Sequence, residues 1–183
     1  MMPEISLNIL DVAQNSVTAG AKLTAISITA DSAADLLTVS ISDDGCGMTP
    51  EQVARVADPF FTTRKTRDIG LGVPFLKMSA EITGGTFNIE SRQGEGTTVT
   101  VVFCLGNIDR MPMGDIGGTM TALIAANPDI DFVLEYAVDG AGFSADTRQF
   151  REVLGGDISL GEPAVIEYIT GYINENIAEC GRL

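Results

Sequence analysis

The chain has 183 residues, of which 45% are hydrophobic and 20% charged, and this length and composition are typical of a globular protein with a sizeable core. Its net charge of −14 disfavours attraction to DNA, RNA or an anionic membrane surface, so we expect neither a nucleic-acid nor a membrane partner. The chain contains no histidine, which removes the usual general base and leaves acid–base chemistry to carboxylates or lysine.

The first predicted element is an amphipathic helix over residues 4–19, because apolar residues recur there at helical spacing. On another face of this helix Asn8, Asp11 and Asn15 recur three and four residues apart, so their side chains lie above one another on successive turns. Such a polar row is either a solvated face or part of a site.

Two strands are predicted within residues 23–42, and the second runs directly into the loop DDGCGM. This loop sets the carboxylate of Asp43 beside Gly45 and Gly47, and glycines let a backbone approach a ligand closely. A short helix is predicted next, because Thr49 suits the N-cap position and is followed by a proline.

A second glycine-rich loop, residues 68–73, precedes a helix predicted over residues 73–85. The free N–H groups of a first helical turn attract anions, and Arg64, Lys65 and Arg67 lie just before this loop. The segment therefore indicates a place where a phosphate is held. The alternative is a solvated loop whose glycines only make turns.

The rest of the chain predicts further strands and helices. TFNIES and TTVTVVFC are expected as strands with a hairpin-like connection, RQGEG. After residue 105 we expect a helix in DIGGTMTALIAAN, strands in DIDFVLEYAV and GFSADTR, and a terminal amphipathic helix in EPAVIEYITGYINENIAE. Residues 106–183 hold 13 acidic and 4 basic side chains. The alternatives for this part are a packed extension of the sheet and an acidic docking surface; we expect the first for its core and the second for its exposed face.

The cysteines and the N-terminal segment predict a cytoplasmic protein. Cys46, Cys104 and Cys180 form neither a CxxC pair nor an even disulfide framework, so we expect reduced thiols. The opening MMPEISLNIL lacks a basic region and a cleavage site, and no apolar run approaches the roughly 20 residues that span a bilayer.

Five segments of the chain occur in a characteristic order: the helix with Asn15, the loop Asp43-x-Gly45-x-Gly47, DPFFTTRK, Gly70-x-Gly72, and GEGT at residues 94–97. Together they resemble the GHKL superfamily of ATP-binding domains, which includes histidine kinases, anti-sigma-factor serine kinases, gyrase-type topoisomerases, Hsp90 chaperones and MutL proteins.

The resemblance implies a fold of the α/β class, an α+β two-layer sandwich called the Bergerat fold, with a mixed sheet covered on one face by helices. It covers roughly residues 4–105. We therefore expect an ATP-binding domain over residues 1–105 and a small C-terminal α/β extension over residues 106–183.

The resemblance also implies how the base of ATP is recognised. Asp43 would accept a hydrogen bond from the adenine amino group, while Gly45 and Gly47 would let the chain bend around the base. A carboxylate only accepts hydrogen bonds, and guanine presents a carbonyl where adenine presents an amine, so adenine is predicted over guanine. Thr97 would support Asp43 directly or through a water molecule.

By the same resemblance Asn15 would be the magnesium ligand, with ATP and Mg²⁺ as the cofactors. Asp11, one turn earlier, would be the catalytic residue that orients or deprotonates a water or hydroxyl nucleophile. The alternatives for Asp11 are a role beside the magnesium ion without contact to it, or a place on a plain polar face.

The phosphates would be held by the loop of Gly70, Leu71 and Gly72 together with a basic residue, for which Lys65 is our choice. Which of the three basic residues before this loop makes the contact is left open.

The expected function is binding of magnesium-ATP and transfer of its γ-phosphoryl group to a partner protein or to water, in regulation or signalling. Because the chain has no histidine, we expect the phosphoacceptor to be another protein. Two alternatives are a serine kinase similar to the anti-sigma factors and a non-catalytic module in which bound ATP changes partner binding. The partner and the oligomeric state stay open.

Overall fold

The computed structural model of the chain describes residues 4–56, 72–155 and 158–183. The helices in these ranges are α1 (Ile5–Thr18), α2 (Pro50–Arg55), α3 (Gly72–Ile82), α4 (Ile116–Ala126), α5 (Thr147–Leu154) and α6 (Pro163–Cys180). The strands are β1 (Leu23–Asp31), β2 (Leu36–Asp43), β3 (Thr86–Arg92), β4 (Gly96–Cys104), β5 (Asp131–Val138) and β6 (Ala141–Asp146).

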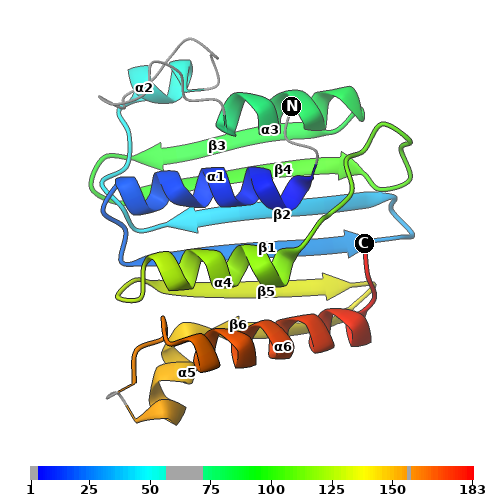
Figure 1. The fold of residues 1–183 in the computed structure, drawn as a ribbon. Coiled ribbons are helices and arrows are strands. Elements are labelled where there is room, and N and C mark those ends of the chain that lie inside the picture. Colours follow the sequence, from blue (N-terminus) through cyan, green and yellow to red (C-terminus); the bar gives the residue numbers. More distant parts are fainter. Residues whose placement is uncertain (1–3, 57–71, 156–157) are drawn as a thin grey trace.

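All six of these strands belong to one sheet, in the order β3-β4-β2-β1-β5-β6 (Figure 1). Strand β1 pairs in parallel with β5, and the other neighbouring pairs are antiparallel, so the sheet is mixed. Strands β5 and β6 thus continue the sheet that the N-terminal part of the chain begins.

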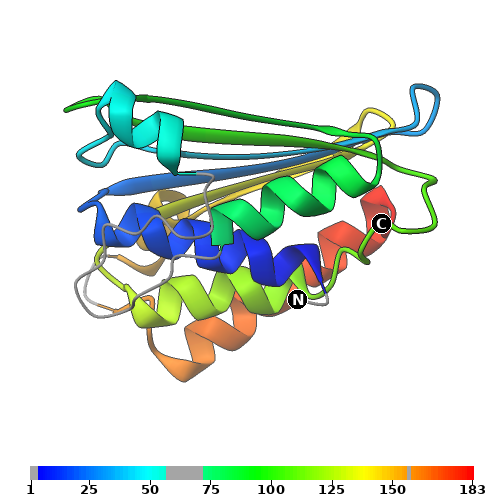
Figure 2. The ribbon, with the colours of Figure 1, turned by 90° about the horizontal axis from the view of Figure 1, so that it is seen from above.

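Helices α1, α3, α4 and α6 lie on one side of this sheet (Figure 2). Alternate strand residues point toward them and are buried, as Leu37, Val39 and Ile41 are in β2. The expected two-layer arrangement, with a mixed sheet covered by helices on one face, is confirmed.

In β2 and β4 the residues that point to the other face are mostly hydroxyl residues, which accounts for the alternation of apolar and polar side chains in these two strands. Two cross-strand pairs of hydroxyl groups form hydrogen bonds between β2 and β4. Ser40 lies 3.3 Å from Thr100, and Ser42 lies 2.9 Å from Thr98.

The start of α2 follows the sequence expectation. The hydroxyl of Thr49 accepts a hydrogen bond from the N–H of Gln52, and the side chain of Gln52 accepts one from the N–H of Thr49.

The expectation for residues 142–148 was wrong at its end, because the strand stops at Asp146 and α5 begins at Thr147. The side chain of Asp146 caps this helix by accepting from the N–H of Arg148 at 2.9 Å.

Among the helices that the structure describes, none is long and apolar enough to cross a membrane.

Candidate functional site

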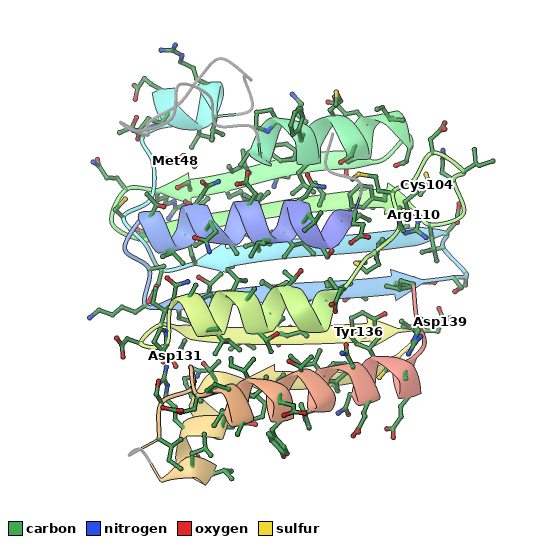
Figure 3. The ribbon with its side chains drawn as sticks, in the orientation of Figure 1. Met48, Cys104, Arg110, Asp131, Tyr136 and Asp139 are labelled. Atoms are coloured by element: carbon green, nitrogen blue, oxygen red, sulfur yellow. The ribbon has the colours of Figure 1, made fainter. Side chains whose placement is uncertain are left out.

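A pocket of about 390 Å³ lies between α1, the loop after β2, α2 and the first residues of α3, with side chains of β2, β3 and β4 completing its wall. Six predicted site residues line it: Asp11, Asn15, Asp43, Gly47, Gly72 and Thr97. Met48, which also lines the pocket, lies on the chain between β2 and α2 (Figure 3). Residues from four separate stretches of sequence are thus brought together.

The polar row on α1 is divided between two environments. Asp11 and Asn15 face the pocket, whereas Asn8 is 1% exposed and lies outside it. The side-chain amide of Asn8 donates a hydrogen bond to the carbonyl oxygen of Glu4 at 3.0 Å. Regular spacing alone therefore does not distinguish the pocket residues from a buried one.

Both oxygens of the Asp43 carboxylate accept hydrogen bonds within the protein. The N–H of Gly45 donates to Oδ1 at 2.9 Å, and the hydroxyl of Ser16 donates to Oδ2 at 2.7 Å. Ser16 is 2% exposed and comes from α1, so this bond joins the helix to the end of β2. Ser16 was not among the predicted site residues, because no local pattern indicates a contact with a residue 27 positions later.

The adjacent carboxylate, Asp44, binds backbone N–H groups. It accepts hydrogen bonds from the N–H groups of Lys22 at 2.7 Å and Leu23 at 2.9 Å, and so anchors the beginning of β1. The bond from Leu23 is the main reason that the pKa of Asp44 lies below its usual value of 3.8. Of the two neighbouring aspartates, Asp43 is the one that faces the pocket.

The two glycines of this loop are needed because other parts of the chain come very close. Gly47 has a φ of +64°, and a Cβ at this position would collide with the carbonyl oxygen of Arg92. A Cβ at Gly45 would lie 2.9 Å from the Cβ of Ala19. Gly47 lines the pocket, whereas Gly45 packs against the end of α1.

Thr97 lies opposite Asp43 in the β2–β4 ladder, and its hydroxyl pairs with that of Ser91 at 2.9 Å. The Ser91 hydroxyl also accepts from the N–H of Met48 at 2.8 Å and donates to the carbonyl oxygen of Gly96 at 2.9 Å. Ser91, which the sequence analysis did not identify, therefore ties the glycine loop to the beginning of β4.

Gly72 begins α3 directly beside the Asp11 carboxylate, because a Cβ on Gly72 would collide with Asp11 Oδ2. A carboxylate beside a helix N-terminus is stabilised by the free N–H groups and the dipole of that helix. The predicted phosphate-binding residues Lys65, Gly70 and Leu71 lie outside the described residues.

The side-chain oxygens at this pocket are of the kind that magnesium prefers. Among the described residues, no three histidine, cysteine, aspartate or glutamate side chains are grouped so that they could hold a metal ion. Magnesium, however, is often bound through one or two protein oxygens together with substrate phosphates. The amide oxygen of Asn15 and the carboxylate of Asp11, which line one pocket, are donors of this kind.

Comparison with known proteins gives a consistent result. The family model described as "Histidine kinase-, DNA gyrase B-, and HSP90-like ATPase" matches residues 4–107. Histidine protein kinase DivJ of Caulobacter vibrioides is 32% identical over 104 residues, which are 55% of this chain and 17% of that protein. Sensor histidine kinase ZraS of Escherichia coli is 29% identical over 106 residues, which are 58% of this chain and 23% of that protein.

A solved structure agrees in fold. The ATPase domain of Aquifex aeolicus MutL, complexed with ADP, superposes with a TM-score of 0.52 at 14% sequence identity, covering 85% of this chain and 70% of that one.

Proposed function

Because this chain belongs to the family of histidine kinase-, DNA gyrase B- and HSP90-like ATPases, we propose that it binds magnesium-ATP in the pocket of Asp11, Asn15 and Asp43. The γ-phosphoryl group then passes to a partner protein or to water, in a regulatory or signalling role. The observation that carries the proposal is the Asp43 carboxylate, held by a hydrogen bond on each oxygen at the wall of a pocket large enough for a small-molecule ligand.

Asp43 is the base-reading residue in this proposal. Its carboxylate only accepts hydrogen bonds, so it pairs with the 6-amino group of adenine and is mismatched with the carbonyl oxygen of guanine. Gly47 supports this role, because its backbone approaches the end of β3 and shapes the loop next to Asp43.

Asn15 is the residue that would hold the magnesium ion, which neutralises phosphate charge when it is bound. Asp11, one turn away on α1, orients the attacking hydroxyl or water and accepts its proton. Lys65 and the residues Gly70 and Leu71, which precede α3, complete the phosphate contacts.

The phosphoryl acceptor is a separate question. The relatives named above are histidine kinases, and the present sequence contains no histidine, so in this proposal the acceptor is a partner protein or water. The matched residues cover only 17% and 23% of the length of those two kinases, so the activities of the whole kinases are not assigned to this chain.

We propose that residues 1–105 bind the nucleotide and that residues 106–183 form an extension with a different function. In support, every described residue that lines the pocket precedes residue 100. The acidic exposed side of this extension is the proposed docking surface for a partner.

The test is calorimetric titration of the protein with ATP and with GTP, each with and without magnesium. We expect saturable ATP binding that magnesium strengthens and that GTP does not reproduce. Asp43→Asn should raise the dissociation constant of ATP by about 10-fold or more, since a hydrogen bond to a charged group contributes about 1.5–3 kcal/mol.

Asp44→Asn is the matched control, because it removes the neighbouring charge outside the pocket and should leave ATP binding nearly unchanged. Absence of ATP binding, or equal binding of ATP and GTP, would refute the proposal.

A further inference from the structure

Ser16 is a buried hydroxyl next to the proposed base-reading carboxylate. We propose that Ser16 is a positioning residue that orients Asp43 and thereby sets selectivity for the 6-amino group of the base. This inference rests on the proposed function of the pocket. It assigns to Ser16 a specificity role that neither its helix position nor its burial requires.

The hydrogen bonds of Asp43 fix its carboxylate from two sides. Gly45 donates to Oδ1 at 2.9 Å from the loop that follows β2, and Ser16 donates to Oδ2 at 2.7 Å from α1. With one donor on each oxygen, rotation of the carboxylate about the Cβ–Cγ bond breaks both bonds. Removal of the Ser16 hydroxyl leaves only the local bond from Gly45, so that rotation of the carboxylate then breaks one hydrogen bond instead of two.

The Asp43 carboxylate still has acceptor positions available for the ligand. An ionised carboxylate has about four lone-pair positions, of which Ser16 and Gly45 occupy one on each oxygen. The remaining positions accept from the amino group of the base.

The position of Ser16 on α1 also links the two ends of the proposed ligand. The same helix carries Asn15 and Asp11, which would meet the metal and the phosphates, while Ser16 reaches the residue that meets the base. Ser16 is 2% exposed, and its hydroxyl is held by the hydrogen bond that it donates to Asp43. One rigid element therefore sets the distance between base recognition and phosphate recognition.

The experiment compares ATP with purine riboside 5′-triphosphate, which is ATP without its 6-amino group. The ratio of the two dissociation constants reports the contact between Asp43 and the amino group. We expect a ratio of about 10 in the original chain and a fall to below about 3 in Ser16→Ala, because a misaligned charged hydrogen bond loses most of its contribution. Ser16→Thr keeps the hydroxyl and should restore the ratio in part.

Ser6→Ala is the matched control. Ser6 is also a buried serine of α1, with 1% exposure, but its hydroxyl donates to Glu4 and lies outside the pocket. We expect this variant to keep the original ratio.

Equal weakening of both nucleotides in Ser16→Ala, including loss of both, would overturn the inference, because a purely structural role affects the two ligands alike. Failure of the inference is distinguishable from failure of the proposed function. If the original chain binds ATP and Asp43→Asn lowers the ratio while Ser16→Ala does not, only the role of Ser16 is wrong. If the original chain does not bind ATP, the proposed function fails and the inference fails with it.

Discussion

Substitution of Gly47 by alanine tests the close approach between the glycine loop and the end of β3. Gly47 has a φ of +64°, and a Cβ there would collide with the carbonyl oxygen of Arg92 and lie 2.7 Å from its carbonyl carbon. A left-handed conformation costs a residue with a Cβ about 1–2 kcal/mol. Displacement of tightly packed neighbours adds about 1–3 kcal/mol.

We therefore expect Gly47→Ala to lower the free energy of unfolding by about 2–5 kcal/mol, a large part of the 5–15 kcal/mol typical of a folded domain. The assay is urea-induced unfolding, with the midpoint and the slope measured separately so that a change in stability is not confused with a change in compactness. ATP affinity should also fall, because the displaced backbone belongs to the loop beside Asp43.

Gly20→Ala is the control that isolates the contact. Gly20 has a φ of +75°, similar to that of Gly47, but a Cβ there would meet no atom within 4 Å. Gly20→Ala should therefore lower the free energy of unfolding only by the cost of the left-handed conformation, about 1–2 kcal/mol. If the two variants lose the same stability, the approach of Arg92 to Gly47 does not constrain the loop and the reasoning is refuted.

Two further variants test the proposed chemistry and the stability of the C-terminal part. Asp11→Ala should reduce phosphoryl transfer or ATP hydrolysis by about 100-fold or more, since general acid–base groups contribute on this scale, while calorimetry still detects bound ATP; undiminished turnover would remove Asp11 from the catalytic role. A hydrogen bond from Arg148 is the main reason that the pKa of Asp146 lies below its usual value of 3.8. The ionised carboxylate therefore stabilises the fold fully above pH 3.8, and this contribution is lost as the pH falls through the lowered pKa. The difference in urea midpoint between the original chain and Asp146→Asn should therefore shrink from neutral pH toward pH 3, and a constant difference would contradict this assignment.

The sequence was informative wherever a local rule applies. Helical spacing located α1 to within a residue at each end, and the sequence Thr49-Pro50 predicted the start of α2. The order of the glycine-rich motifs led to the family and hence to the fold, including the mixed sheet.

Features that depend on distant contacts were beyond this reasoning. Gly47 is a glycine because Arg92, 45 positions later, comes against it, and no local pattern indicates that approach. Ser16 was missed because a single serine in a helix has many uses, and only the fold brings it to Asp43. The end of β6 was misjudged for a different, local reason: Asp146 caps α5 through Arg148, only two residues later, and this N-cap signal was overlooked.

The pairing of β1 with β5 has a consequence for how the protein is divided into pieces. The family match ends at residue 107, but β1 lies inside the sheet, between β2 and β5. A fragment that stops at the end of the match would leave one edge of β1 without its neighbour, and unpaired edges invite association with other chains. The end of the family match is therefore a poor place to cut the chain, and a fragment that keeps the edge of β1 paired has to include β5.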